Sequence, residues 1–152
     1  MKKNFIIGII LGILITLVIL YFIGKNTETN NLPEELPLPE NMSNIDSMTE
    51  NILQSLNNGN YTGFSRDFSG RIELILTEAS FIEVRNLISE TSGKYISKTT
   101  PKLYEIEGYN TLDYLCKFEK ENVFVTLSLS KDLEKVEGIL FDSPTLRERT
   151  GQ

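Results

Sequence analysis

Histidine and tryptophan are both absent from this chain of 152 residues, and cysteine occurs once, at position 116. Without histidine the chain lacks the usual general base near neutral pH and the usual partner of a catalytic cysteine. A single cysteine excludes an intrachain disulfide. The sequence also has no P-loop, no GxSxG motif and no zinc-ligand spacing. These absences predict no cofactor and no metal, and they favour a non-catalytic protein while leaving an enzyme open.

Charge is missing from one long stretch near the amino terminus. Residues Phe5 to Ile23 read FIIGIILGILITLVILYFI, which is long enough to span the hydrocarbon core of a bilayer as a helix. No cleavage site for a signal peptidase follows it. Lys2 and Lys3 precede the run, and lysines stay on the cytoplasmic side. We therefore predict a single-pass cell-membrane anchor over residues 1–24, with a cytoplasmic amino terminus and an extracytoplasmic carboxy-terminal domain.

Two glycines inside the apolar run allow a further expectation. Gly8 and Gly12 have the GxxxG spacing that lets two transmembrane helices approach closely. A homodimer formed through this pair is one interpretation. The other is that glycine is simply common in transmembrane helices.

The part of the chain after residue 25 is acidic. It contains 12 basic and 21 acidic residues, a net charge of −9. Such a charge repels phosphate backbones, so we predict no nucleic-acid partner. Residues 25–44 are rich in proline and glutamate and poor in apolar side chains, and they are predicted to form a flexible linker.

Residues 45–142 show helical periodicity first and strand periodicity afterwards, which predicts an α+β domain with about three helices packed on a curved antiparallel meander sheet. A capping-box pattern at Ser47 to Glu50 predicts a helix that ends at Gly59, and a second capping box starts at Ser80. A short helix is expected across Tyr61 to Phe68. The strands are predicted at 95–100, 103–107, 111–119, 123–129 and 135–141. Residues 143–152 are predicted to be a disordered tail.

Alternation along one predicted strand decides the environment of the cysteine. Cys116 shares a face with Leu112, Tyr114 and Phe118, so it is expected to be a buried, unreactive thiol.

Aromatic residues are numerous enough to line an apolar pocket, and the alternative is that they fill the core. We favour the core. The candidate pocket residues are Tyr61, Phe64, Asp67, Phe68, Tyr95, Tyr104 and Tyr114. Carboxylates could do acid–base work in such a pocket, and the candidates are Asp67, Glu105, Glu107 and Asp113. Two glycosylation sequons start at Asn41 and Asn60.

Three segments carry a resemblance to a known family: LNNGNYTGFSRDFS from Leu56, GKYISKT from Gly93 and CKFEKENVFVTLSLSKD from Cys116. Together they resemble an uncharacterised prokaryotic domain family, over about 46–142. The resemblance implies a cone-shaped α+β fold, like the nuclear-transport-factor or cystatin-like folds. Members stand behind a membrane anchor or are fused to hydrolases, and the family has no assigned activity or functional residues to transfer.

The leading hypothesis is a membrane-anchored, extracytoplasmic accessory module that binds an unknown protein or small-molecule ligand without catalysis. One alternative is a small-molecule enzyme that uses carboxylates and tyrosines in a cone-shaped pocket. The other is a structural cell-envelope interaction domain without a pocket. A filled aromatic core favours the last of these, and an open cone favours the accessory module. An open cone with a buried carboxylate of shifted pKa favours the enzyme.

Overall fold

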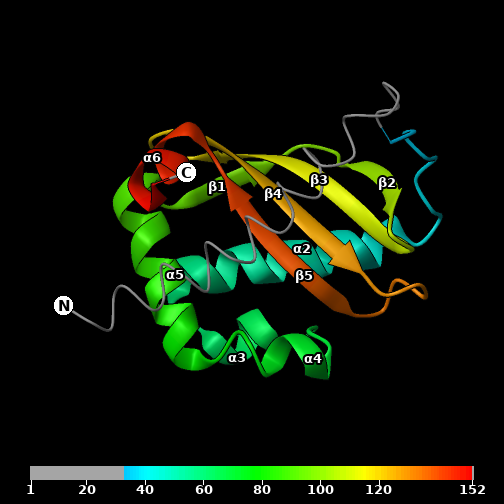
Figure 1. Ribbon diagram of the computed structural model, residues 1–152, viewed down its shortest axis with the longest axis horizontal. Helices are drawn as coiled ribbons and strands as arrows, with labels where there is room; N and C mark the ends of the chain where they lie inside the picture. Colours follow the sequence, from blue (N-terminus) through cyan, green and yellow to red (C-terminus); the bar gives the residue numbers. More distant parts are fainter. Residues whose placement is uncertain (1–32, 152) are drawn as a thin grey trace.

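The computed structural model describes residues 33–151. The predicted anchor, with Gly8 and Gly12, lies outside these residues. Between Pro33 and Gly151 the structure contains no helix long and apolar enough to cross a bilayer. The described residues form one layer of helices against one face of a sheet (Figure 1).

The helices are α2 (Met42–Asn58), α3 (Tyr61–Ser65), α4 (Gly70–Glu73), α5 (Glu78–Thr91) and α6 (Pro144–Thr150). The strands are β1 (Tyr95–Lys98), β2 (Lys102–Ile106), β3 (Tyr109–Phe118), β4 (Asn122–Leu129) and β5 (Val136–Asp142). The α+β class is therefore confirmed, and each predicted strand is present with small shifts at its ends.

The five strands form one antiparallel sheet in which β3 is paired on both sides. β4 follows on one side of β3 and β5 lies beyond it. On the other side, β2 pairs with the first half of β3 and β1 with its second half. β2 to β5 are thus a meander, but β1 pairs with β3 rather than with β2. Pro101 separates the two short strands, since proline interrupts a strand and offers no N–H.

The core lies between the sheet and α2, which runs beneath it (Figure 1). The buried helix residues are Ile45, Met48, Ile52, Leu53 and Leu56. The buried strand residues include Leu112, Tyr114, Cys116, Phe118, Val123, Val125, Leu127 and Leu129. The predicted faces of both long strands, and the burial of Cys116, are confirmed. Burying one such side chain contributes about 1.5–3 kcal/mol, so this seam provides much of the driving force for folding.

Helix starts differ from the sequence predictions. α2 begins at Met42, and the Ser47 hydroxyl donates to the Ser43 carbonyl inside the helix instead of capping its end. α5 is capped by Thr77, whose side chain accepts from the Ser80 N–H. The predicted end of α2 is confirmed, because Gly59 has the left-handed conformation (φ 67°) that terminates a helix.

Both predicted flexible segments contain ordered structure. Met42–Asn44 belong to α2, and the Leu36 N–H donates to the Leu103 carbonyl at 2.8 Å. The predicted tail is wrong for residues 144–150, which form α6. Ser143 caps this helix by accepting from the Leu146 N–H at 3.1 Å, and Leu146 is buried. One apolar side chain in a polar segment gives little periodicity, so this helix depends on packing that the local sequence does not reveal.

Candidate functional site

The phenylalanines of the predicted pocket pack against one another. Phe64 and Phe68 are buried, and the ring centroid of Phe64 lies 5.1 Å from Phe68 and 4.8 Å from Phe81. Tyr61 flanks this cluster, half-buried, and donates its hydroxyl to the Leu76 carbonyl at 3.0 Å. The helix predicted through Phe68 ends at Ser65, and Phe68 instead forms a bridge with Val136. These rings are a filled core cluster.

The remaining pocket candidates are dispersed. Asp67 accepts from the guanidinium of the adjacent Arg66, and Tyr104 lies on β2 opposite Thr111. Tyr95 of β1 and Tyr114 of β3 face α2, to which their hydroxyls donate. Residues 33–151 contain a cavity of about 40 Å³ near Leu56 and Arg85 and a hollow of about 650 Å³ between α5 and α6. None of the seven candidates lines either of them. The structure therefore does not bring the predicted set together around one pocket.

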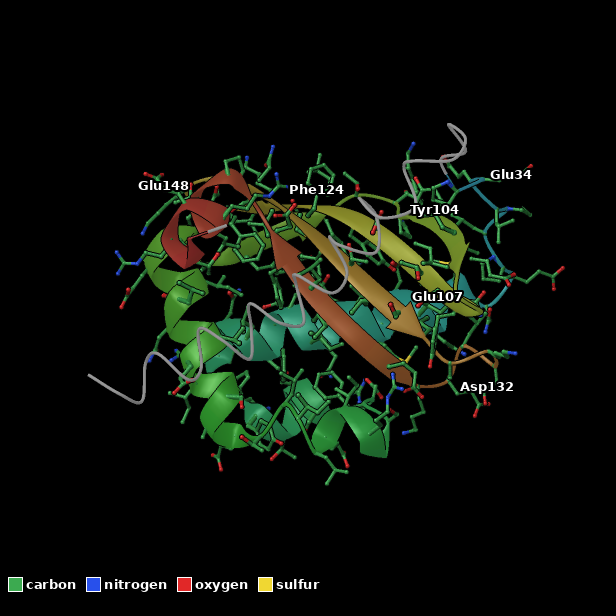
Figure 2. All side chains as sticks on the ribbon, in the orientation of Figure 1. Glu34, Tyr104, Glu107, Phe124, Asp132 and Glu148 are labelled. Atoms are coloured by element: carbon green, nitrogen blue, oxygen red, sulfur yellow. The ribbon has the colours of Figure 1, made fainter. Side chains whose placement is uncertain are left out.

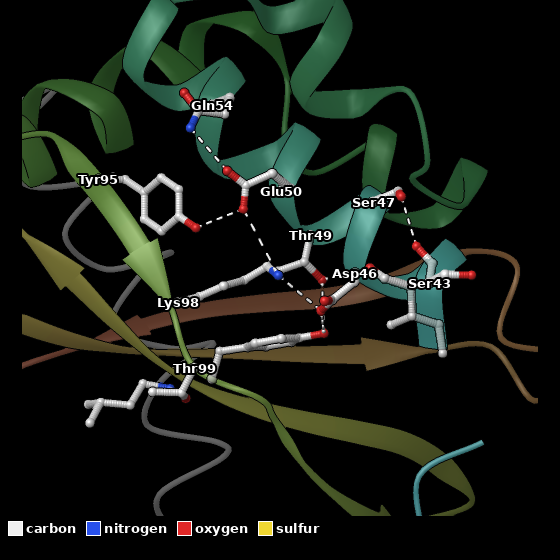
Figure 3. A network of polar contacts seen from close by, with 12 residues as sticks. Ser43, Asp46, Ser47, Thr49, Glu50, Gln54, Tyr95, Lys98 and Thr99 are labelled. Carbon is white, nitrogen blue, oxygen red and sulfur yellow. Dashed lines mark hydrogen bonds and ion pairs between the residues drawn. The ribbon is translucent and has the colours of Figure 1, made fainter. Parts of the chain in front are cut away.

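A polar cluster that the sequence reading missed lies at one side of α2 (Figure 3). Asp46 and Glu50 are four residues apart on this helix, which contains no basic residue. Like charges at this spacing repel each other. Lys98 of β1 approaches both, with its Nζ 2.9 Å from Asp46 Oδ1 and 4.0 Å from Glu50 Oε2. The lysine side chain is only 11% exposed, so the cation is held between the helix and the sheet.

Two tyrosines complete the polar cluster, which we define as Asp46, Glu50, Tyr95, Lys98 and Tyr114. The Tyr95 hydroxyl donates to Glu50 at 2.8 Å, and the Tyr114 hydroxyl donates to Asp46 at 3.3 Å. The Lys98 Nζ also lies 5.4 Å from the centroid of the Tyr114 ring. Every charged group of the cluster thus has an opposite charge or a hydroxyl beside it.

The protonation states follow from this environment. Burial, followed by the bond to Glu50, raises the pKa of Tyr95 far above its usual range, and burial does the same to the pKa of Tyr114. Burial also raises the pKa of the Cys116 thiol to about 12. All three groups therefore stay protonated near neutral pH and provide neither a base nor a thiolate. The cluster is suited to clamping α2 onto β1 and β3.

The four carboxylates considered for acid–base chemistry stand apart. Asp67 is held by Arg66, and Asp113 accepts from the Thr126 hydroxyl at 2.6 Å. Glu105 and Glu107 are exposed near the end of β2. Among the described residues, no group of three or more carboxylate or cysteine side chains is placed to hold a metal ion.

The two sequons occupy helix starts. Asn41 is exposed just before α2. Asn60 caps α3, because its side-chain oxygen accepts from the Gly63 N–H at 3.1 Å.

An apolar surface patch lies on the side of the sheet away from α2. Because Val123 and Val125 point into the core, Phe124 points outward, and it is 53% exposed (Figure 2). Leu115 is its direct partner across β3 and β4 and is also exposed. Ile96 of the neighbouring strand β1 is 52% exposed. Ile96 lies further along the sheet, beyond Lys117, so we call Leu115 and Phe124 the outer patch.

A protein-family model described as "Protein of unknown function (DUF3887)" matches residues 49–138, more than half of the chain. The chain belongs to this family. The predicted membership in an uncharacterised family is thus confirmed, and DUF3887 covers the sequence from α2 into β5. Comparisons with curated proteins and with solved structures found no match. The polar cluster lies partly outside the matched range, since Asp46 precedes it.

Proposed function

We propose that this protein is a non-catalytic contact domain, held on the extracytoplasmic side of a membrane by residues 5–23, and that it binds a partner protein through the outer patch. The observation that carries the proposal is the pairing of Leu115 with Phe124, two large apolar side chains exposed side by side on adjacent strands. Exposed apolar groups that adjoin one another mark interaction sites more often than isolated ones do.

The packing of the domain interior favours a binding site on the surface over one in an internal pocket. The candidate aromatic rings are packed against each other, and the groups of the polar cluster are paired. A small-molecule site is normally an apolar cavity of about 300–1,000 Å³. The cavity near Arg85 has only about 40 Å³. The hollow of about 650 Å³ between α5 and α6 is lined by polar and charged side chains that are mostly exposed to solvent. A protein partner needs only an accessible face, and the outer patch offers one.

The expected anchor supports a role close to the membrane. Nine residues separate Ile23 from Pro33, where the described structure begins. Ten peptide steps of fully extended chain reach about 35 Å, which keeps the domain within roughly its own diameter of the bilayer. The partner is then a protein of the same cell envelope or a membrane neighbour.

Site-directed photo-crosslinking in intact cells tests the proposed partner. A photoreactive phenylalanine analogue at position 124 should give one discrete cross-linked product. Leu115→Ser should weaken that product, because it removes the neighbouring apolar contact. Leu74→Ser is the matched control, since Leu74 is 82% exposed but lies in the loop after α4. Equal effects of the two substitutions, or no product at all, would contradict the proposal.

Added protease tests the proposed topology. Protease supplied to intact cells should remove the domain, because Asn26 onward is expected outside. Complete protection of the domain in intact cells, with cleavage after lysis, would show that the orientation is wrong.

A further inference from the structure

The two edges of the sheet differ in how they are protected. Exposed edge strands tend to pair with other chains, and proteins block this with bulges, prolines, lysines or a covering segment. The edge formed by β1 and β2 has all four of these protective features. It has a register irregularity after Tyr95, a break at Pro101, the exposed side chain of Lys102, and the bridge from Leu36 to Leu103.

Among residues 33–151, backbone groups cover the opposite edge, β5, only at its start. The Val136 N–H donates to the Asp67 carbonyl, and the Val136 carbonyl accepts from the Ser69 N–H, both at 2.9 Å. A register irregularity follows between Val136 and Gly138. From Gly138 to Asp142 the strand pairs regularly with β4, and within residues 33–151 no backbone group pairs with its outer side. This stretch, GILFD, contains neither proline nor lysine.

We propose that the open edge of β5 binds the β5 edge of a second copy of this chain, antiparallel and with a two-fold axis at Leu140, so that two sheets become one. This goes beyond the proposed function, because it concerns a different surface and a different partner. The two-fold axis places Leu140 opposite Leu140 of the second copy, and Ile139 opposite the second copy's Phe141.

The side chains of β5 suit this self-pairing. Ile139 and Phe141 are partly buried against the core, so their cross-strand pairs would extend the cores of both copies. Asp142 would lie opposite a glycine, Gly138 of the second copy, and it is already paired with Arg147 in its own chain. Glu137 would lie opposite Ser143 and accepts from Ser69 at 2.9 Å. No like charges face each other directly.

The expected contact is small. Gly138–Asp142 span about 17 Å at the usual rise of a strand, well short of a typical stable interface. Two copies anchored in the same membrane have a higher effective concentration than two copies free in solution. This favours a weak contact between them. The test therefore uses the full chain in the cells that express it.

Disulfide cross-linking distinguishes edge pairing from random contact. Leu140→Cys should give several-fold more oxidised dimer than the wild-type chain, since opposing residues have Cβ atoms about 5 Å apart. Thr126→Cys is the matched control. It pairs with Leu140 on β4 and shares its face, but three strand spacings, about 14 Å, would separate it from its copy. Dimer at position 140 that is no more abundant than at position 126 or in the wild type would overturn the proposal.

A second pair of variants keeps the test decisive if Leu140→Cys does not fold. Chains with Gly138→Cys and chains with Asp142→Cys, carrying different tags, should cross-link with each other when coexpressed. Gly138→Cys alone should not, because four residues of strand, about 14 Å, separate it from its copy. Cross-linking of Gly138→Cys to itself at the same level would also overturn the two-fold arrangement.

Discussion

Glu121 connects three parts of the fold, and replacing it with glutamine gives the sharpest test of the structure. It lies in the turn between β3 and β4. Its carboxylate accepts hydroxyl bonds from Ser92 at 2.7 Å, Ser143 at 3.0 Å and Thr145 at 2.9 Å. Ser92 ends α5 and Ser143 caps α6, and both are buried. One carboxylate therefore holds two helix ends against the sheet.

The size of the expected loss of stability follows from the number and kind of hydrogen bonds that Glu121 accepts. A hydrogen bond to a charged group contributes about 1.5–3 kcal/mol net. Glutamine retains one acceptor oxygen, so Glu121→Gln removes the charge and disturbs one or two of the three bonds. We expect a loss of about 2 kcal/mol in the free energy of unfolding. Glu134→Gln is the control, because Glu134 is exposed, and it should change stability by less than about 0.5 kcal/mol.

The pH dependence of this loss has a definite sign. Burial alone would raise the pKa of Glu121, but the bonds from Ser92, Thr145 and Ser143 outweigh it, and the pKa is lowered. A carboxyl whose pKa is lower in the folded state stabilises the fold above its unfolded pKa of about 4.3. That stability is lost as the pH falls through the folded pKa. The wild type and Glu121→Gln should therefore converge at low pH.

Urea unfolding of a fragment beginning at Pro33, followed by circular dichroism at several pH values, measures both effects. The stability gap should be largest near pH 7 and should close below about pH 4. A gap that stays constant down to pH 3 would refute the electrostatic explanation. If Glu121→Gln is as stable as the control Glu134→Gln at pH 7, the structural role of Glu121 is refuted.

Three further outcomes are expected. Phe64→Ala should lower the free energy of unfolding in urea by about 3–5 kcal/mol, because it leaves a cavity at a buried position. An unfolding midpoint equal to that of the wild type would favour an open pocket instead. Lys98→Met should cost about 1 kcal/mol by leaving Asp46 and Glu50 uncompensated, and salt near 1 M should reduce that loss; a salt-independent loss would point to packing. A polar thiol reagent should label Cys116 only after unfolding, whereas rapid labelling of the native protein would show that the β3 register is wrong by one residue.

The chemistry of the polar cluster depends on contacts that no local pattern reveals. Tyr95 and Tyr114 were identified as candidates from the sequence, although as pocket residues. Asp46, Glu50 and Lys98 were missed, because the lysine lies about 50 positions away from both carboxylates in the chain. One signal was available: Asp46 and Glu50 repel each other on a helix without basic residues, so a cation from another element was needed.

Local sequence patterns were enough to predict the α+β class, the five strands, the buried face of β3 with Cys116, and the end of α2 at Gly59. Each of these follows from neighbours within a few residues, because alternation and helix-ending glycines act locally. Three features became visible only in the folded chain: β1 pairs with β3, the predicted tail forms α6 over Leu146, and the rings of Phe64, Phe68 and Phe81 pack together in the core favoured from the sequence. These features join segments far apart in the chain, and their stability comes from packing that exists only once the sheet and helices have met.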